Sequence, residues 1–146
     1  MTDTSQVLRP VLSFLHHHKP FSQMSLTHQE YLAMHLEQVF FAEGDSILSS
    51  REGRVETFYI IKSGLVCAEN NMDKLSINVQ EALQPVIILE PGDCFPLTAL
   101  INKRAVNFQH RALKSTICYK LKHYHFEYLM QQSTTFHHFI FAHIVS

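Results

Sequence analysis

Apolar residues in the first part of the chain recur at helical intervals. Near the N-terminus they lie three and four residues apart, which places them on one face of a helix, at Leu8, Val11, Leu12 and Leu15. A second series with this spacing ends at Val39, and Thr27 and Glu30 have the spacing of a capping box that would begin its helix. The pattern therefore predicts two helices within residues 5–38.

From residue 39 onward the apolar residues form short runs of strand composition, separated by glycine turns. The runs are Val39–Ala42, Phe58–Ile61, Leu65–Cys67, Pro85–Leu89, Val106–Ala112 and Thr116–Leu121. Pro85–Leu89 is almost continuously apolar, so we expect a buried strand there, whereas the polar residues 69–84 before it indicate a hairpin. Short strands at nearly even spacing are typical of an antiparallel sandwich or barrel, here over residues 39–122.

The helical period returns after the last predicted strand and indicates two C-terminal helices within residues 123–146. The second of them has an unusually wide apolar surface, formed by Phe136, Phe139, Ile140, Ile144 and Val145. Either this surface covers one mouth of the β-structure or it pairs with another helix. We expect residues 1–146 to form a single domain, because the chain is long enough for one core and short for two.

Charge and targeting patterns exclude several kinds of partner. With 12 basic and 13 acidic residues, a net charge of −1 and a pI near 6.8, the chain has no basic excess of the kind that binds nucleic acids or anionic membranes. No signal-peptide pattern opens it, and its longest apolar stretch, Phe136–Val145, is too short to span a bilayer. Cys67, Cys94 and Cys118 lack metal-ligand spacing and fit reduced core thiols, so we expect a cytoplasmic domain.

The chain has 11 histidines, but their positions do not indicate a metal or a catalytic site. His16–His18 lie at a predicted helix end, where consecutive side chains point in different directions. A metal-dependent enzyme of the cupin type would need two histidines alternating on a strand, yet His123 and His125 fall at a predicted helix start and His110 stands alone on its strand. Serine, cysteine and glycine motifs of hydrolases and nucleotide-binding enzymes are missing too, so we expect a protein without catalytic activity.

Three segments with turn glycines, EGDSIL, FYIIKSGLV and LEPGDCF, follow one another in the sequence. In this order they resemble the cyclic-nucleotide-binding domain family, and the resemblance covers essentially the whole chain. It implies a mainly β fold, an antiparallel β-jelly-roll with N- and C-terminal α-helices, in a regulatory domain. In that family the cyclic phosphate binds to a cassette of the form Phe-Gly-Glu-x-Ala-Leu, followed by a loop that carries Pro-Arg-Ser/Ala-Ala.

The corresponding stretch of this chain, Glu90–Ala112, retains part of that cassette. The matching positions are Phe95, Ala99 and Leu100. Pro96 replaces the family's glycine, which removes one backbone N–H, and we expect it to open a short helix as the first helical residue. Leu97 replaces the glutamate that accepts a hydrogen bond from the ribose 2′-hydroxyl, and its side chain cannot accept one.

Two positions compete for the family's phosphate-binding arginine. Counting without gaps from Phe95 places Val106 there, whereas a loop shorter by two residues places Arg104 there. Arg111 is a second cation that would bind an anion in a bidentate manner, and Lys103 would add a point charge. The predicted ligand-binding residues are Phe95, Pro96, Leu97, Thr98, Ala99, Arg104 and Arg111. The ligand we expect is a nucleotide or another phosphate-bearing small molecule, with no bound cofactor.

Features of this stretch resemble one branch of the family in particular. These are Phe95-Pro96-Leu97, Lys103-Arg104 and Gln109–Ala112. The branch comprises bacterial signalling proteins in which such a domain precedes paired CBS modules and a nucleotidyltransferase-like region, which implies that the domain regulates a larger protein. Two functions stay open: a sensory domain for a phosphate-bearing ligand, or a ligand-free interaction module. In the second, Leu97 and Val106 complete the core, and the C-terminal helix mediates dimerisation or contact with further domains.

Loss of the glutamate leads to a prediction about the family's usual ligands. A charge-assisted hydrogen bond contributes about 1.5–3 kcal/mol, which corresponds to roughly 10- to 150-fold in affinity. Calorimetric titration of the protein with cAMP and with cGMP should therefore show no tight binding. A low-micromolar dissociation constant for either nucleotide would contradict the interpretation of Leu97.

Overall fold

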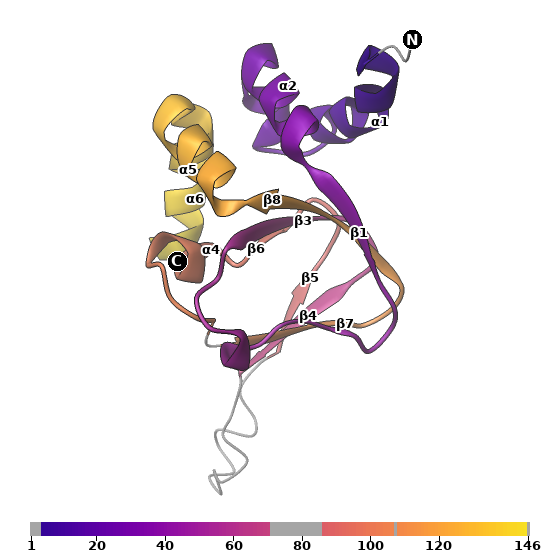
Figure 1. The fold of residues 1–146 in the computed structure, drawn as a ribbon, viewed down its shortest axis with the longest axis vertical. Helices are drawn as coiled ribbons and strands as arrows, with labels where there is room; N and C mark the ends of the chain where they lie inside the picture. The colour runs from indigo at the N-terminus through magenta and orange to yellow at the C-terminus, as the bar shows by residue number, and fades with distance from the viewer. Residues whose placement is uncertain (1–3, 71–85, 107, 146) are drawn as a thin grey trace, which may run out of the picture.

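The structure is a computed structural model that describes residues 4–70, 86–106 and 108–145. Within this part of the chain, two antiparallel four-stranded sheets enclose the core, with strand orders β1-β8-β3-β6 and β2-β7-β4-β5 (Figure 1). The predicted fold class, an antiparallel β-jelly-roll with N- and C-terminal helices, is confirmed. The hairpin expected over residues 69–84 lies almost entirely outside the described residues.

The strands are β1 (Glu37–Phe41), β2 (Ser46–Leu48), β3 (Thr57–Ser63), β4 (Val66–Asn70), β5 (Ile87–Leu89), β6 (Cys94–Phe95), β7 (Phe108–Ala112) and β8 (Thr116–Lys122). The helices are α1 (Thr4–His16), α2 (Leu26–His35), α4 (Leu97–Ile101), α5 (His123–Gln132) and α6 (Thr134–Val145), with short 3-10 turns at Phe21–Gln23 and Ser50–Glu52. The first sheet begins at Glu37, two residues before the predicted start of the β-region. In Figure 1, α1, α2 and α5 lie on the side of the roll that carries β1, β8 and β3.

The two N-terminal helices pack against each other and against the first sheet. Leu15 of α1, Leu32 of α2 and Phe21 of the turn that joins the two helices are fully buried, and Gln29 donates from Nε2 to the Phe21 carbonyl over 2.7 Å. The start of α2 differs from the prediction, because the Ser25 hydroxyl caps it by accepting from the N–H of His28. Serine is a strong N-cap residue, and the chain uses it two positions before the predicted capping box.

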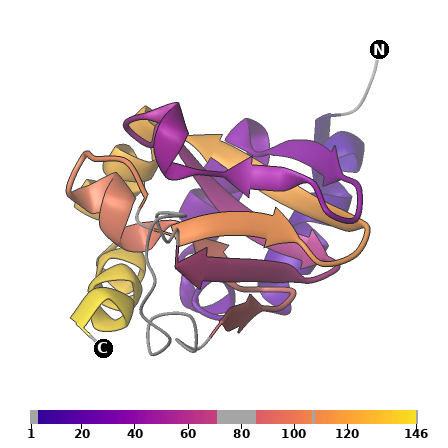
Figure 2. The same ribbon diagram turned by 90° about the horizontal axis from the view of Figure 1, so that it is seen from below.

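Two residues of the apolar surface predicted for α6 are buried within the domain. Phe136 and Ile140 are fully buried, and the Phe136 ring packs edge-on against Phe58 of β3 and Phe126 of α5, at centroid distances of 5.9 and 5.6 Å. This helix lies against α5 and α4, and Figure 2 shows it in yellow at the left of the β-roll. Phe141, in contrast, is 41% exposed. No helix among the described residues combines the length and the apolar composition needed to cross a membrane.

The prediction that Pro85–Leu89 forms a buried strand is wrong in one respect. Residues 87–89 do form a strand, β5, but Val86, Ile87 and Ile88 are each about half exposed, at 50%, 49% and 48%. The reason is that β5 is at the edge of its sheet, where it pairs with β4 and with no other strand that the structure describes. A run of apolar residues indicates a strand but does not determine how many of its faces and edges are covered.

All three cysteines are free thiols, as predicted. Cys67 and Cys118 are buried and Cys94 is half-buried. Burial raises the pKa of Cys67 to about 11 and that of Cys118 to about 12, and it also raises the pKa of Cys94. These thiols are therefore protonated at neutral pH and are poor nucleophiles.

The turn between β3 and β4 requires a glycine for two reasons. Gly64 has a φ of +101°, and a Cβ atom at this position would lie 2.7 Å from the Ser115 carbonyl oxygen and closer still to the hydroxyl of Thr116. That hydroxyl holds the turn, because it accepts from the Leu65 N–H and donates its one proton to the nearer of two carbonyl oxygens, that of Lys114 at 2.8 Å, with the Leu65 oxygen at 3.2 Å.

We predict that Gly64→Ala lowers the free energy of unfolding by about 2–5 kcal/mol, because backbone strain and a steric clash add. Gly44→Ala is the matched control, since Gly44 has a φ of +89° but no atom within 4 Å of the added Cβ. This control should cost only about 1–2 kcal/mol, from strain alone. Chemical denaturation of both variants measures the difference, and equal losses would contradict the role assigned to the contact with Thr116.

Candidate functional site

A cavity of about 290 Å³ lies between the segment that contains β6 and α4 and the inner face of the second sheet. Strands β4, β5 and β7 supply its second wall through side chains such as Ala68, Leu89 and His110. Six of the seven predicted ligand-binding residues line it, namely Phe95, Pro96, Leu97, Thr98, Ala99 and Arg104. The cavity is close to the lower end of the roughly 300–1,000 Å³ that is usual for small-molecule sites.

The short helix α4 forms one side of the cavity. Pro96 is its N-cap residue, with an extended ψ of 129°, and Leu97 is the first helical residue, so the predicted place of Pro96 is shifted by one position. Ala99 and Leu100 are buried and anchor the helix to the core. Thr98 and Leu97 are more exposed and border the opening, which gives this side one hydroxyl and one apolar side chain.

Arg104 lies in the loop after α4 and is held by its own backbone. Its N–H donates to the Ala99 carbonyl over 3.1 Å, and its carbonyl accepts from the N–H of Val55, also over 3.1 Å. Lys103, its neighbour, has a left-handed φ of 54° and lines a different cavity, beside Phe126. The loop therefore directs Arg104, and not Lys103, to the candidate site.

Both candidates for the family's arginine position reach this cavity. Val106 is 4% exposed and belongs to the hydrophobic core, whereas Arg104 is half-buried. The cavity thus has one guanidinium and one buried valine where the sequence left two alignments open.

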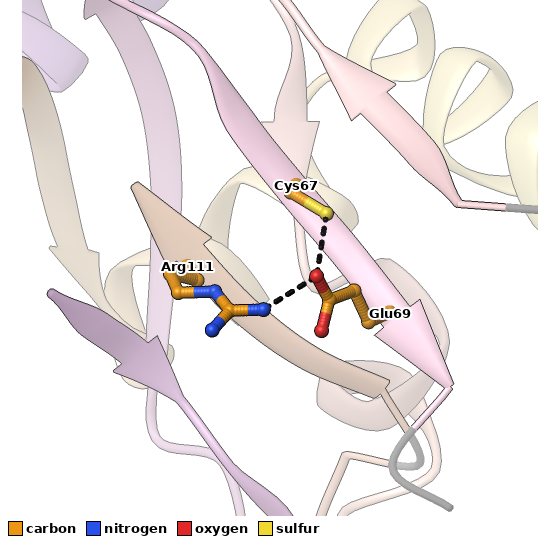
Figure 3. A network of polar contacts seen from close by, with 3 residues as sticks. All are labelled: Cys67, Glu69 and Arg111. Atoms are coloured by element: carbon orange, nitrogen blue, oxygen red, sulfur yellow. Dashed lines mark hydrogen bonds and ion pairs between the residues drawn. The ribbon is translucent and has the colours of Figure 1, made fainter. Parts of the chain in front are cut away.

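Arg111 does not line the cavity, in contrast to the prediction. It lies on β7 next to His110, and successive strand residues point to opposite faces of a sheet. On that other face it forms an ion pair with Glu69, with Nη2 and Oε1 2.5 Å apart (Figure 3). The hydrogen bond from Arg111 lowers the pKa of Glu69, which also accepts from the thiol of Cys67. This guanidinium is therefore already paired with a carboxylate.

Sequence reasoning missed His110 as part of the site. Its side chain lines the cavity, is 6% exposed, and stacks on Phe95 with ring centroids 4.9 Å apart and planes 11° from parallel. Phe95 stacks in turn on Tyr59 of β3, at 5.1 Å and also at 11°. The available signal was the period of two along β7, which places His110 on the same face as the buried Ala112.

The other histidines singled out in the sequence lie close to protein groups, although not all of them form hydrogen bonds. His16 bonds with Gln29 over 2.7 Å. His125 shares a 2.7 Å hydrogen bond with the Tyr31 hydroxyl, and His123 lies 3.8 Å from the Glu127 carboxylate. Among the residues that the structure describes, no group of three or more histidine, cysteine, aspartate or glutamate side chains is placed to hold a metal ion.

The family model of the cyclic nucleotide-binding domain matches residues 38–133. The chain belongs to this family. Its matched region includes all eight strands described here, apart from the first residue of β1, and both walls of the cavity. The expected resemblance to this family is thereby confirmed, and no curated protein sequence matches the chain significantly.

Solved structures with this fold come from very different organisms. The regulatory domain of Toxoplasma gondii PKA, in a co-crystal with cAMP, is 22% identical over 86% of this chain and 46% of its own, with a TM-score of 0.71. The regulatory subunit of a cAMP-independent protein kinase A from Trypanosoma cruzi, bound to guanosine, is 20% identical over 90% and 44%, with a TM-score of 0.72.

The sensor domain of the transcriptional regulator DNR from Pseudomonas aeruginosa is 14% identical over 92% of this chain and 90% of its own, with a TM-score of 0.68. This cyclic nucleotide-binding domain therefore spans most of the bacterial sensor domain and less than half of the kinase regulatory chains. At these identities, the likeness is one of fold.

The buried imidazole of His110 leads to a pH prediction. Burial lowers the pKa of His110 to about 4 from its ordinary value of 6.5. Between these two values the unfolded chain binds a proton at this residue and the folded domain does not, so the free energy of unfolding falls as the pH falls through this window. Above pH 6.5 both states are neutral at this residue and the penalty is absent.

In His110→Phe, the loss of unfolding free energy between pH 7 and pH 5 should be smaller by about 2 kcal/mol than in the unsubstituted protein. Urea denaturation of both proteins at the two pH values measures this difference. If the two proteins lose the same amount on acidification, His110 does not carry the predicted penalty.

Proposed function

We propose that this domain is a regulatory sensor without catalytic activity that binds a nucleotide or another phosphorylated small molecule in the cavity beside α4. The observation that carries the proposal is the placement of Arg104 and Thr98 on the wall of an otherwise largely apolar cavity, in the stretch whose sequence resembles the family's phosphate cassette. A cation and a hydroxyl beside apolar walls suit a ligand with one anionic end and one organic end.

Arg104 is the group best suited to bind the phosphate. A guanidinium stays charged at every accessible pH, and its planar fork matches two phosphate oxygens. Within the described part of the chain, no other lysine or arginine lines this cavity, because Lys103 borders another one and Arg111 is paired with Glu69. Binding of the anion therefore depends on one side chain.

The contacts available to the rest of the ligand differ from those that the family usually makes with a cyclic nucleotide. Leu97 supplies no acceptor for a ribose hydroxyl, so this position lacks the carboxylate that a cyclic nucleotide would use. Two structural neighbours are described with different ligands, cAMP in one case and guanosine in the other. Side chains at the cavity, and not the fold, thus decide which molecule binds.

The larger protein that we infer is a bacterial cytoplasmic signalling protein of the type in which such a domain precedes CBS modules and a nucleotidyltransferase-like region. The stretch from Phe95 to Ala112 supports this branch of the family, and three unpaired thiols fit a reducing compartment. The partly exposed Phe139 and the exposed Phe141 on α6 offer a contact for a second copy or for a following domain.

A ligand-free interaction module is the second candidate, and one observation favours it. Val106, at the family's arginine position in an ungapped alignment, is buried in the core, as expected if the site had been filled by apolar side chains. In that case the cavity would have no ligand, and the contacts of α6 would carry the function.

A thermal-shift screen of nucleotides and phosphorylated metabolites distinguishes the two candidates. We expect at least one compound to stabilise the protein, by about 2.7 kcal/mol at one hundred times its dissociation constant. Arg104→Ala should weaken this binding at least about tenfold, because it removes a charge-assisted contact.

The matched control is Arg111→Ala, the same substitution on the outer face of β7. It removes an ion pair in which the two side chains are 40% and 34% exposed, so it should cost little stability and leave the affinity unchanged. If no compound shifts the melting temperature, or if both arginine variants bind equally well, the sensor proposal is wrong and the interaction module is favoured.

A further inference from the structure

The cavity contains a buried polar side chain with unused hydrogen-bonding capacity. His110 is 6% exposed and forms part of the cavity wall, and its Nδ1 has no hydrogen-bond partner among the residues that the structure describes. Tyr119 and His123 also have a buried atom without such a partner, but neither lines this cavity. Buried polar groups are nearly always hydrogen-bonded, because an unpaired one loses its hydration without compensation.

Packing alone does not account for a histidine at this position. The ring is held flat against Phe95, at a centroid distance of 4.9 Å, and a phenylalanine ring would make the same stacking contact without an unpaired nitrogen. Ala68, which lies opposite His110 in the register of β4 and β7, contributes only a methyl group to the same cavity. A backbone hydrogen bond with Phe108 acts to raise the pKa of the imidazole, but Nδ1 keeps a polar capacity that the described residues do not use, and it has a cavity beside it.

We propose that the His110 imidazole selects the organic part of the ligand, by forming a hydrogen bond with an uncharged hydroxyl or N–H group of a molecule whose phosphate is bound by Arg104. The ligand class is thus a phosphorylated sugar or nucleotide, and not phosphate alone. This inference rests on the proposed function, because it assigns a second contact within the same cavity.

The chemistry of the two side chains separates their roles. Burial keeps the imidazole uncharged at neutral pH, so it offers one N–H donor and one acceptor nitrogen but no charge to an anion. Arg104 carries the permanent charge and comes from the loop after α4, whereas His110 comes from the second sheet. A ligand that meets both must present an anionic group to one wall and a neutral polar group to the other. His110 would supply a polar contact in a site where Leu97 supplies none.

The test is calorimetry with four probes: 5′-AMP, 5′-GMP, ribose 5-phosphate and inorganic phosphate. We expect at least one organic phosphate to bind the unsubstituted protein more tightly than inorganic phosphate does. His110→Phe should lower the affinity for that organic probe about tenfold and leave the affinity for inorganic phosphate unchanged. His110→Asn should recover part of the affinity, because its amide keeps a donor and an acceptor close to the position of Nδ1.

Stability provides a readout that a merely structural histidine would not give. Because His110→Phe removes an unpaired buried nitrogen and keeps the ring stack, its melting temperature at pH 7 without ligand should be no lower than that of the unsubstituted protein. A melting temperature well below it would show that the imidazole is needed for folding, and would overturn the inference.

The arginine variant separates failure of this inference from failure of the proposed function. Suppose that an organic phosphate binds, and that its binding is weakened by Arg104→Ala but not by His110→Phe. In that case the selector role of His110 is wrong, while the sensor function stands. If none of the four probes binds the unsubstituted protein, the inference about His110 is overturned, and the sensor function is then decided by the wider thermal-shift screen and the Arg104→Ala variant.

Discussion

The side chain of Phe95 contacts both sheets of the roll. It stacks on Tyr59, a neighbour within the first sheet, and on His110, which belongs to the second sheet. Phe95 is 3% exposed and directly precedes Pro96, the N-cap of α4, so the stacked ring anchors the chain just before the short helix. The position of Arg104 follows from this helix, since its N–H is bonded to the Ala99 carbonyl. One buried aromatic contact therefore joins the segment that leads to the cation with the strand that carries the histidine.

The distribution of charge around β7 shows why two similar arginines differ. Arg111 is near a carboxylate on the outer face of the sheet, where solvent reduces the strength of the pair. Arg104 faces a cavity with apolar walls, where a charge interacts more strongly with any anion that enters and is more costly to leave alone. His110 lies in the same low-dielectric surroundings and avoids that cost by remaining neutral. Arg104 and Arg111 have the same side chain, and their different surroundings give the two guanidinium groups different chemistry.

Most of the architecture could be predicted from the sequence, because it depends on local patterns. Period and turn glycines indicated the helices at both ends and the strand-rich middle, and the matching cassette residues identified the place of the cavity. The errors concern properties that no local pattern contains. The edge position of β5 depends on which strand pairs with which, and a run of apolar residues does not report this.

The errors at the site have the same origin. The prediction for Arg111 considered its charge and not the side of the strand on which it lies, although a period of two separates it from His110. His110 was considered only as a metal ligand, and its contact with Phe95 joins residues of different sheets. The choice between Arg104 and Val106 could not be made by alignment, because a loop of changed length brings both to one cavity.

The short helix α4 lies between the cavity and the C-terminal helices. Ala99 lines the cavity on one side, and Leu100 borders Phe126 and Phe141 on the other. A ligand changes a protein's state only through contacts that differ between states. α4 contacts both the cavity and the C-terminal helices, so a ligand can act on those helices only to the extent that it favours one position of α4 over another.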